Sequence, residues 1–337
     1  MADSELIMLA HGAGGLVSQQ LIAREFAPFL AQAGQELNDA AVIALGEQRV
    51  AFSTDSFTVS PLFFPGGDIG SLAVHGTVND LAMMGAQPRF LSLALVIEEG
   101  FPADDLHRIV SSVAEAAERC GVAVVTGDTK VVERGAADGL FINTSGLGLV
   151  YEQADINPTR LTPGDAVLIN GTIADHGIAV MCAREQLEVS GEILSDSASV
   201  AEVVAELIEA LGTDVHALRD PTRGGLAATL NELAAQAGVV MEIEQRAVPL
   251  KPQVAGVCEI LGLDPLHVAC EGKFVAFVTR ARAEEALRIM SGLPGGKEAA
   301  ILGEVVAAGP PQVRLRTPLG TTRIVEMPAG ELLPRIC

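Results

Sequence analysis

The sequence has 337 residues, of which 49% are hydrophobic and 19% charged, with a formal net charge of −21. This length exceeds what one hydrophobic core usually supports, so it favours two domains. An acidic chain with no tryptophan and one tyrosine lacks the cations that neutralise nucleic-acid phosphates and the rings that stack on bases. We therefore expect no nucleic-acid partner.

The first residues and the cysteines indicate the cellular compartment in which we expect the protein. The first residues lack the positive region of a secretory signal, and no apolar run reaches the length of a membrane span. Five cysteines, an odd number, show neither disulfide nor zinc-ligand spacing: Cys120, Cys182, Cys258, Cys270 and Cys337. These features predict a cytoplasmic protein with reduced thiols and no membrane association.

A glycine-rich segment precedes the first predicted helix, which runs to about Leu30. In His11-Gly12-Ala13-Gly14-Gly15 the glycines would let backbone N–H groups approach an anion closely. The segment lacks the Lys-Ser/Thr pair of a P-loop, so a phosphate contact by Gly14 and Gly15 and a plain turn are equally compatible with it.

Two aspartates in the first half lie where a ligand could reach them. The predicted strands 41–45 and 49–54 lead to Asp55, just past a strand end. A helix over 69–84 carries Asp80 among apolar neighbours, and a carboxylate in apolar company needs a partner such as a metal ion.

A third aspartate follows the predicted strand 122–126, which opens into Gly127-Asp128-Thr129-Lys130. One such aspartate alone would be interpreted as a cap or turn residue. Because hard cations bind oxygen ligands, Asp55, Asp80 and Asp128 together predict a Mg²⁺ site.

Strands alternate with helices throughout, which predicts an α/β fold. Further predicted strands cover residues 89–97, 140–150, 166–170, 239–244, 274–279 and 301–305, with a hairpin of 313–316 and 322–326. Further predicted helices cover residues 102–120, 178–184, 197–211, 226–237, 254–261 and 283–290. Prolines and glycines around residues 158–165 mark the domain boundary.

The second half adds candidate ligand-binding residues. Asp220, Arg223 and Gly224 stand just before the predicted helix 226–237, whose N-terminus favours phosphate. Asp220 precedes a proline, so a turn-forming role is open too. Glu271 precedes Gly272 and a strand, and an ion pair with Lys273 is the structural alternative for it.

Residues 327–337 have little periodicity and predict a mobile arm that ends at Cys337. Eleven residues could extend about 35–40 Å, so the thiol could cross a domain. A frayed end and a tethered reactive thiol are both open interpretations.

Several motifs together resemble a known superfamily. Residues 76–86, 125–130 and 220–226 are similar to the ATP-binding superfamily of aminoimidazole ribonucleotide synthetase, selenophosphate synthetase and thiamine-monophosphate kinase. With His11–Gly15 and Pro334-Arg335-Ile336-Cys337, the match narrows to the HypE family of hydrogenase maturation proteins. The resemblance covers nearly the whole chain. Cys270 departs from the asparagine expected before Glu-Gly in many relatives.

The resemblance implies a two-domain α/β fold. Residues 1–155 would form an N-terminal mixed sheet or half-barrel with helices that binds ATP and dimerises. Residues 156–326 would form an α/β sandwich, followed by the flexible tail 327–337. It further implies a homodimer, loading of a carbamoyl group onto Cys337 by the carbamoyltransferase HypF, ATP-dependent dehydration to a thiocyanate, and transfer of cyanide to a HypC–HypD scaffold.

The resemblance also implies roles for these residues. Asp55, Asp80, Asp128 and Asp220 would hold Mg²⁺, and Thr129, Arg223, Gly224, Gly14 and Gly15 would contact ATP. Lys130 is the expected cation near the developing charge, and Glu271 the expected base. Two other functions stay open: phosphorylation of a small molecule by another enzyme of the superfamily, and a non-catalytic thiol carrier.

Overall fold

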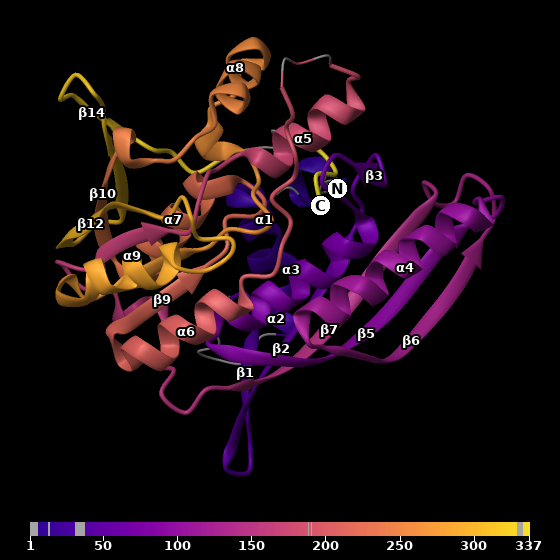
Figure 1. Cartoon of the computed structure of the whole chain (residues 1–337), viewed down its shortest axis with the longest axis horizontal. Helices are drawn as coiled ribbons and strands as arrows, with labels where there is room; N and C mark the ends of the chain where they lie inside the picture. Colours follow the sequence, from indigo (N-terminus) through magenta and orange to yellow (C-terminus); the bar gives the residue numbers. More distant parts are fainter. Residues whose placement is uncertain (1–5, 13, 31–37, 188, 190, 329–332) are drawn as a thin grey trace, which may run out of the picture.

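Two β-sheets organise the chain, and each takes its strands from one half of the sequence (Figure 1). The computed structural model describes residues 6–12, 14–30, 38–187, 189, 191–328 and 333–337. The first sheet uses strands between residues 41 and 150, and the second uses strands between residues 166 and 324. The α/β fold of two units is confirmed, while the boundary at 155/156 stays a prediction.

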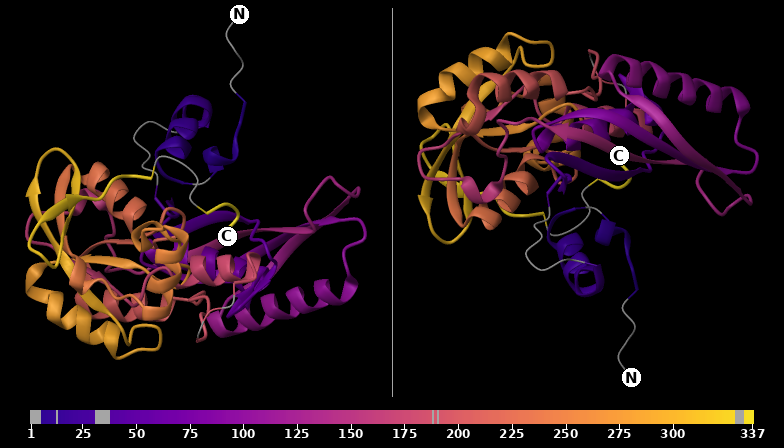
Figure 2. Two further views of the ribbon diagram at one scale, coloured as in Figure 1. Left: turned by 90° about the horizontal axis from the view of Figure 1, so that it is seen from above. Right: turned by 90° about the horizontal axis from the view of Figure 1, so that it is seen from below.

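The first sheet is mixed and has helices on one face. Its strand order is β1-β2-β7-β5-β6, and only β5 and β6 pair in parallel. The strands are β1 (Ala41–Leu45), β2 (Gln48–Phe57), β5 (Ala86–Glu98), β6 (Ala123–Val132) and β7 (Leu140–Val150). Helices α3 (Ile69–Met83) and α4 (Ala103–Cys120) lie on one face (Figures 1 and 2). Among the described residues no element covers the other face, and β6 is exposed along almost its whole length.

Helix α3 connects the first sheet to the rest of the molecule. The short ribbon of β3 (Phe63–Phe64) and β4 (Gly67–Asp68) leads into it, and the Asp68 carboxylate accepts hydrogen bonds from the backbone N–H groups of Gly70 and Ser71. This N-cap confirms the predicted helix start. Every residue of α3 except Asp80 is buried. Asp80 and Gly76 both line one cavity, and Asp80 is the only charged side chain that the helix brings to it.

The second sheet is an α/β sandwich of the predicted kind, with strand order β14-β13-β10-β12-β8-β11-β9. Its strands are β8 (Ala166–Ile169), β9 (Val215–Arg219), β10 (Val239–Glu244), β11 (Val275–Val278), β12 (Ala300–Ala308), β13 (Gln312–Arg316) and β14 (Thr322–Ile324). Helices α5 (Asp175–Arg184), α7 (Gly225–Ala237) and α8 (Pro252–Leu261) pack on one face. Helices α6 (Ala201–Leu211) and α9 (Ala283–Ser291) pack on the other, where α3 joins them.

The N-terminal helical segment stands away from both sheets (Figure 2). It consists of α1 (Gly15–Leu21), a π-helical turn (Ile22–Phe26) and α2 (Ala27–Leu30), so the predicted helical stretch is confirmed as far as Leu30, the last described residue before 31–37. No helix among the described residues has both the length and the apolar character needed to cross a membrane.

Several local predictions differ from the structure. The helix predicted over 197–211 begins at Ala201. Strand β2 continues through Asp55 to Phe57, because it pairs with β7 as far as Ile142. Strand β9 was not predicted. The predicted loop at Gly127–Lys130 is part of β6. A Cβ on Gly127 would lie 2.3 Å from the backbone oxygen of Leu93 on β5, so this glycine allows close pairing of strands rather than a turn.

Candidate functional site

A cavity of about 920 Å³ collects side chains from distant parts of the sequence. Its wall includes the N-terminal segment, β2, α3, the loop between β9 and α7, and the last residue of the sequence. The residues that line it include two glycines, one thiol and eight charged side chains: Gly14, Gly15, Cys337, Asp39, Asp55, Asp80, Arg219, Asp220, Arg223, Glu232 and Glu271. Most of the residues predicted for the site therefore face one space.

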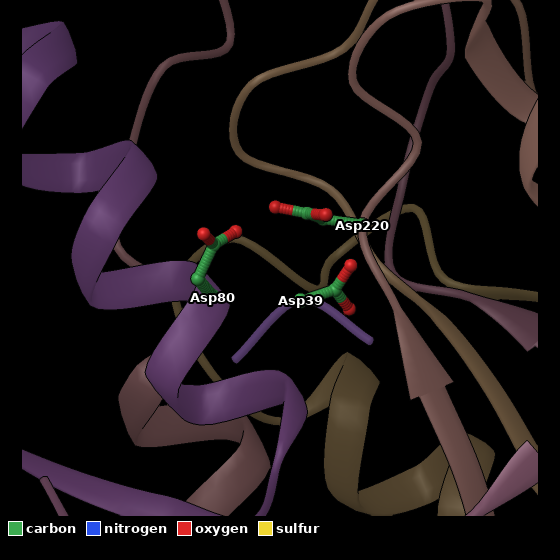
Figure 3. A group of neighbouring side chains, drawn as sticks. All are labelled: Asp39, Asp80 and Asp220. Carbon is green, nitrogen blue, oxygen red and sulfur yellow. The ribbon is translucent and has the colours of Figure 1, made fainter. Parts of the chain in front are cut away.

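Three carboxylates that line this cavity lie close together (Figure 3). Asp39 precedes β1, Asp80 projects from α3, and Asp220 directly follows β9. One oxygen atom of each lies within 4.8 Å of the others. The Ser53 hydroxyl donates to Asp80 Oδ2 at 2.6 Å, which fixes the Asp80 side chain toward the group.

Burial of the aspartate cluster disfavours the charged form of each carboxyl group. Desolvation raises the pKa of Asp39 to about 6, although the Arg219 guanidinium opposes the rise. Burial, followed by the neighbouring aspartates, raises the pKa of Asp80 and of Asp220 well above the usual range. Arg219 Nε lies 3.2 Å from Asp39 Oδ2 without hydrogen-bond alignment, so that buried oxygen has no hydrogen-bond partner.

The donor set fits a hard divalent cation. Mg²⁺ prefers carboxylate oxygen ligands, and the cluster offers only such ligands, one of them the orphaned Asp39 Oδ2. A cation would also remove the cost of holding like charges in a poorly solvated space. Of the four aspartates predicted as metal ligands, the structure therefore brings together Asp80 and Asp220. Asp55 lines the same cavity from β2.

Asp128, Thr129 and Lys130 lie elsewhere. They are on β6, the edge strand of the first sheet, and none of them lines the cavity. Lys130 Nζ lies 2.6 Å from Asp128 Oδ2, and both side chains are more than half exposed. Within one copy of the chain these three residues do not reach the aspartate cluster, and their roles stay predictions.

Glu271 is held rigidly by its backbone while its carboxyl group faces the cavity. Its N–H donates to Asp196 Oδ1 at 3.1 Å, and its carbonyl accepts from Asn79 Nδ2 at 3.1 Å. The residue is 3% exposed, and its Oε1 has no hydrogen-bond partner among the described residues. Burial, then the carboxylates of Asp220 and Asp196, raise the pKa of Glu271 well above its usual range.

The structural alternative for Glu271, a surface ion pair with Lys273, is wrong. Glu271 is buried, and the Lys273 ammonium lies 3.6 Å from Asp196 Oδ2 instead. The preceding Cys270 is fully buried in the core of the second unit, where its sulfur accepts from the Ala174 N–H. Its thiol therefore has a packing role.

The two glycine segments meet each other beside the cavity. A Cβ on Gly14 would lie 3.1 Å from Arg223 Cβ, and a Cβ on Gly15 would lie 2.5 Å from the Pro328 carbonyl oxygen. Gly224, in the left-handed region at φ 78°, is the N-cap of α7. Arg223 Nη1 donates to the Gly12 carbonyl at 3.1 Å. Close contacts and a left-handed φ thus favour glycine at these three positions, and their contacts with ATP stay predictions. Arg223 brings a cation to the cavity wall.

The last residue of the sequence forms part of the cavity wall. Cys337 lines the cavity, and the neighbouring Ile336 is 3% exposed within a hydrophobic core cluster. Burial, then the Glu271 carboxylate, raise the pKa of the Cys337 thiol to about 12, and Arg223 opposes the rise. Residues 329–332 of the predicted mobile arm lie outside the described residues, so its mobility stays a prediction.

Sequence reasoning missed Asp39 and Arg219. Asp39 was detectable from the register of the predicted hairpin, since it precedes the first strand of an antiparallel pair in which Ala41 lies opposite Phe52. Extending that register by two residues places Asp39 opposite Thr54, next to Asp55. Arg219 ends the strand that was not predicted.

The raised pKa values predict that, without divalent cations, stability falls as pH rises. The folded protein keeps protons on the cluster at pH values where the unfolded chain has lost them, so the free energy of unfolding decreases as the pH rises above the unfolded pKa of 3.8. For Asp39 this loss extends through a pH of about 6, and the raised pKa values of Asp80 and Asp220 act in the same direction. We expect the melting temperature in EDTA to fall by at least about 3 °C between pH 5.5 and 8, and Mg²⁺ to restore it.

Asp220→Asn should flatten this pH dependence, whereas Asp104→Asn, on the exposed surface of α4, should leave it as in the wild type. A melting temperature that is independent of pH and Mg²⁺ in the wild-type protein would contradict the assignment of the cluster.

Comparison with known proteins identifies the family. Residues 37–150 match the family model for the N-terminal domain of AIR synthase related proteins, and residues 162–316 match the model for the C-terminal domain. The chain is 50% identical over 335 residues to carbamoyl dehydratase HypE of Rhizobium leguminosarum bv. viciae, covering 98% of this chain and 95% of that protein. It is 48% identical over 337 residues to carbamoyl dehydratase HypE of Escherichia coli K12, covering 98% and 99%.

Solved structures agree with this result. A crystal structure of a HypE–HypF complex matches with a TM-score of 0.87 and 49% identity, covering 91% of this chain and 99% of that chain. A structure of the hydrogenase maturation protein HypE in complex with ATP matches with a TM-score of 0.83 and 46% identity, covering 98% and 100%. The thiamine-monophosphate kinase of Aquifex aeolicus, at 18% identity and a TM-score of 0.67 over 91% of this chain and 98% of that one, shares the fold. The chain belongs to the AIR synthase related family and, within it, to the HypE carbamoyl dehydratases.

Proposed function

We propose that this chain uses ATP to dehydrate a carbamoyl group carried on the Cys337 sulfur to a thiocyanate, which supplies cyanide ligands for NiFe-hydrogenase maturation. The observation that carries the proposal is the meeting of Cys337, Glu271, Arg223 and the aspartate cluster in one cavity. A frayed end with an incidental cysteine would have no reason to lie there.

The chemistry explains why these groups are needed together. The oxygen of a thiocarbamate leaves poorly, so transfer of the ATP γ-phosphoryl group to that oxygen makes phosphate the leaving group. Loss of two nitrogen protons and of phosphate then gives the C≡N bond, with ADP as the other product. The site must therefore hold a triphosphate, supply a base near nitrogen, and offset the developing negative charge.

We assign the cation and triphosphate to the aspartate end of the cavity. Asp39, Asp80 and Asp220 would hold Mg²⁺, with Asp55 beside them. When bound, Mg²⁺ would offset the repulsion between the phosphates and the carboxylates that line the cavity. Arg223, next to Gly12, would add a positive charge on the same side.

We assign Glu271 as the base. A buried carboxylate whose pKa lies well above the ordinary value binds a proton strongly, which suits proton abstraction near neutral pH. Its Oε1 has no partner among the described residues, so it is available to a substrate N–H. Its carboxylate is close enough to Cys337 to be a leading influence on the pKa of that thiol.

Loading of the sulfur would take place away from the cavity. A thiol with a pKa of about 12 is almost fully protonated at neutral pH and is a poor nucleophile. We propose that HypF, whose counterpart forms a complex with a relative of this chain, loads Cys337 when the residue is outside. A HypC–HypD scaffold would then accept the cyano group.

We propose a homodimer formed through the uncovered face of the first sheet. This face exposes the large apolar side chains of Ile43, Leu45, Phe52, Phe90 and Val96, and the β6 edge adds those of Val124, Val125 and Val131. Such a patch on one sheet is typical of an interface. Asp128, Thr129 and Lys130 lie on the same strand, so a second copy is the route by which they would contribute to an ATP site.

Replacing Cys337 tests the carrier assignment. Cys337→Ala should retain folding and ATP binding but lose carbamoyl acceptance completely, because the sulfur is the acceptor atom. Intact mass after incubation with the carbamoyltransferase, carbamoyl phosphate and ATP measures this. Cys120→Ala, which removes the other partly exposed thiol, is the control and should be loaded normally. Modification of the Cys337→Ala protein would show that another residue is the carrier.

Replacing Glu271 tests the base. Glu271→Gln should keep ATP binding and loading of Cys337 but slow thiocyanate formation by about 10²–10⁴-fold, since the amide keeps the shape and loses the basic oxygen. Single-turnover mass analysis of the Cys337 peptide, with ADP measured in parallel, reports both steps. Glu259→Gln on the exposed side of α8 should react at the wild-type rate. Wild-type thiocyanate formation by Glu271→Gln would place the base elsewhere.

Charging the proposed dimer face tests the assembly. Val125→Asp buries a carboxylate if the dimer forms there, so it should weaken dimerisation by at least about 100-fold and reduce ATP use with it. Leu319→Asp is the matched control, because Leu319 is 92% exposed on the turn between β13 and β14. Analytical ultracentrifugation gives the result, and an unchanged Val125→Asp dimer would exclude this face.

A further inference from the structure

The last four residues of the sequence are held through their backbone carbonyl groups. Arg184 Nη1 donates to the Pro334 carbonyl at 2.7 Å, and Arg184 Nη2 donates to the Arg335 carbonyl at 2.8 Å. His176 Nε2 lies 2.7 Å from the Ile336 carbonyl. The backbone N–H of Thr58 donates to the Cys337 carbonyl at 3.0 Å. Four consecutive acceptors are thus satisfied by partners from two other parts of the chain.

Hydrogen-bond chemistry fixes the tautomer of His176. A carbonyl oxygen only accepts, so Nε2 must carry the proton that it donates to Ile336. Nδ1 of the neutral ring then accepts from the Ser195 hydroxyl at 2.8 Å, and the Ser195 oxygen accepts from the Ser197 N–H at 3.1 Å. Burial lowers the pKa of His176, which favours this neutral form. The imidazole is therefore locked in an orientation that points Nε2 at the terminal segment.

The same helix carries the second partner. His176 is in the first turn of α5 and Arg184 is its last residue, and this helix packs in the core of the second unit. Arg184 also donates from Nε to the Ser60 carbonyl at 2.8 Å, which ties the end of α5 to the segment after β2. A rigid element thus presents both donors.

Side-chain packing determines which carbonyl group of the terminal segment accepts from Arg184 and which from His176. Ile336 is buried in a cluster with Phe57, Val59 and Phe64. A shift of the segment by one residue would place the charged Arg335 in this apolar space, so the register is specified. Arg335 itself donates from Nε to the Thr58 carbonyl at 2.8 Å and pairs with Asp138.

We propose that His176 and Arg184 are positioning residues for the dehydration: they hold the backbone of residues 334–336 so that the Cys337 sulfur lies in the cavity with Glu271. This inference rests on the proposed function, since it concerns the same sulfur. Neither residue lines the cavity, and each acts through the terminal segment rather than on the reacting atoms.

The first test needs no catalysis. Cys337 should react slowly with iodoacetamide in the wild-type protein, because burial raises its pKa to about 12. His176→Phe keeps a ring but removes both nitrogens, and Arg184→Ala removes the paired donors. We expect either substitution to speed alkylation of Cys337 at least about 10-fold at pH 7.5, measured by peptide mass.

The other cysteines distinguish local release from unfolding. Cys182, Cys258 and Cys270 are buried and should stay unlabelled, while labelling of the partly exposed Cys120 should not change. Arg160→Ala is the matched control, because Arg160 also donates to several backbone carbonyls, those of Asp155, Thr213 and Val215, away from the terminal segment. It should leave the labelling of Cys337 unchanged.

The second test uses turnover. In single-turnover assays of loaded protein, Arg184→Ala and His176→Phe should slow thiocyanate formation at least about 10-fold without slowing loading by the carbamoyltransferase. His176→Gln retains an N–H donor close to the position of Nε2 and should recover much of the rate.

The outcomes are distinct. Labelling of Cys337 at the wild-type rate in both variants would overturn the inference, as would labelling of all five cysteines together, which would mean that these residues support folding. Faster labelling of Cys337 with normal thiocyanate formation would also overturn it. If the wild-type protein makes no thiocyanate while the labelling results hold, the proposed function fails and the anchoring of the segment stands.

Discussion

The cavity gathers Asp39, Asp55, Asp80, Asp220, Glu232 and Glu271, and the described part of its wall sets two arginines against them, Arg219 and Arg223. Repulsion between carboxylates in a poorly solvated space grows as water is removed, so this arrangement is unfavourable unless a cation or protons compensate. The N-terminal segment, the loop between β9 and α7 and the end of the chain all border this space. Their packing therefore depends on how that negative charge is compensated.

Asn79 links this electrostatic centre to the rest of the fold. Its Nδ2 donates to the carbonyls of Ala198 and Glu271, and its Oδ1 accepts from the Val200 N–H. Asn79 immediately precedes Asp80 on α3, so one buried amide sets the distance between the aspartate cluster and the proposed base. The two adjacent polar residues of this apolar helix thus have different roles. Asn79 makes hydrogen bonds to backbone groups, and Asp80 faces the cavity.

Much of the fold could be predicted because it depends on local patterns: the Asp68 cap of α3, the limits of α4 and the whole of β7. Local patterns could not give tertiary pairing. Gly127 resembles a turn residue in sequence, yet it lies in β6 because the Leu93 carbonyl on the neighbouring strand leaves no room for a Cβ. The hairpin register places Asp39 beside Asp55, but its meeting with Asp80 and Asp220 depends on tertiary packing that no local pattern gives. Lys130 was grouped with residues that one copy of the chain does not bring near it.

The charge of the sulfur connects the aspartate cluster to the movement of the terminal segment. A Cys337 thiolate inside the cavity would face Glu271, Asp55 and Asp220, with Arg223 as the opposing charge, and this balance raises the pKa of the thiol. A carbamoylated or cyanated sulfur is neutral and avoids the repulsion. The inserted position therefore suits the loaded forms in the proposed reaction, whereas the thiolate released on cyano transfer is disfavoured there. Electrostatics would thus oppose return of the unloaded thiolate to the cavity, while the contacts made by His176 and Arg184 favour insertion in every form.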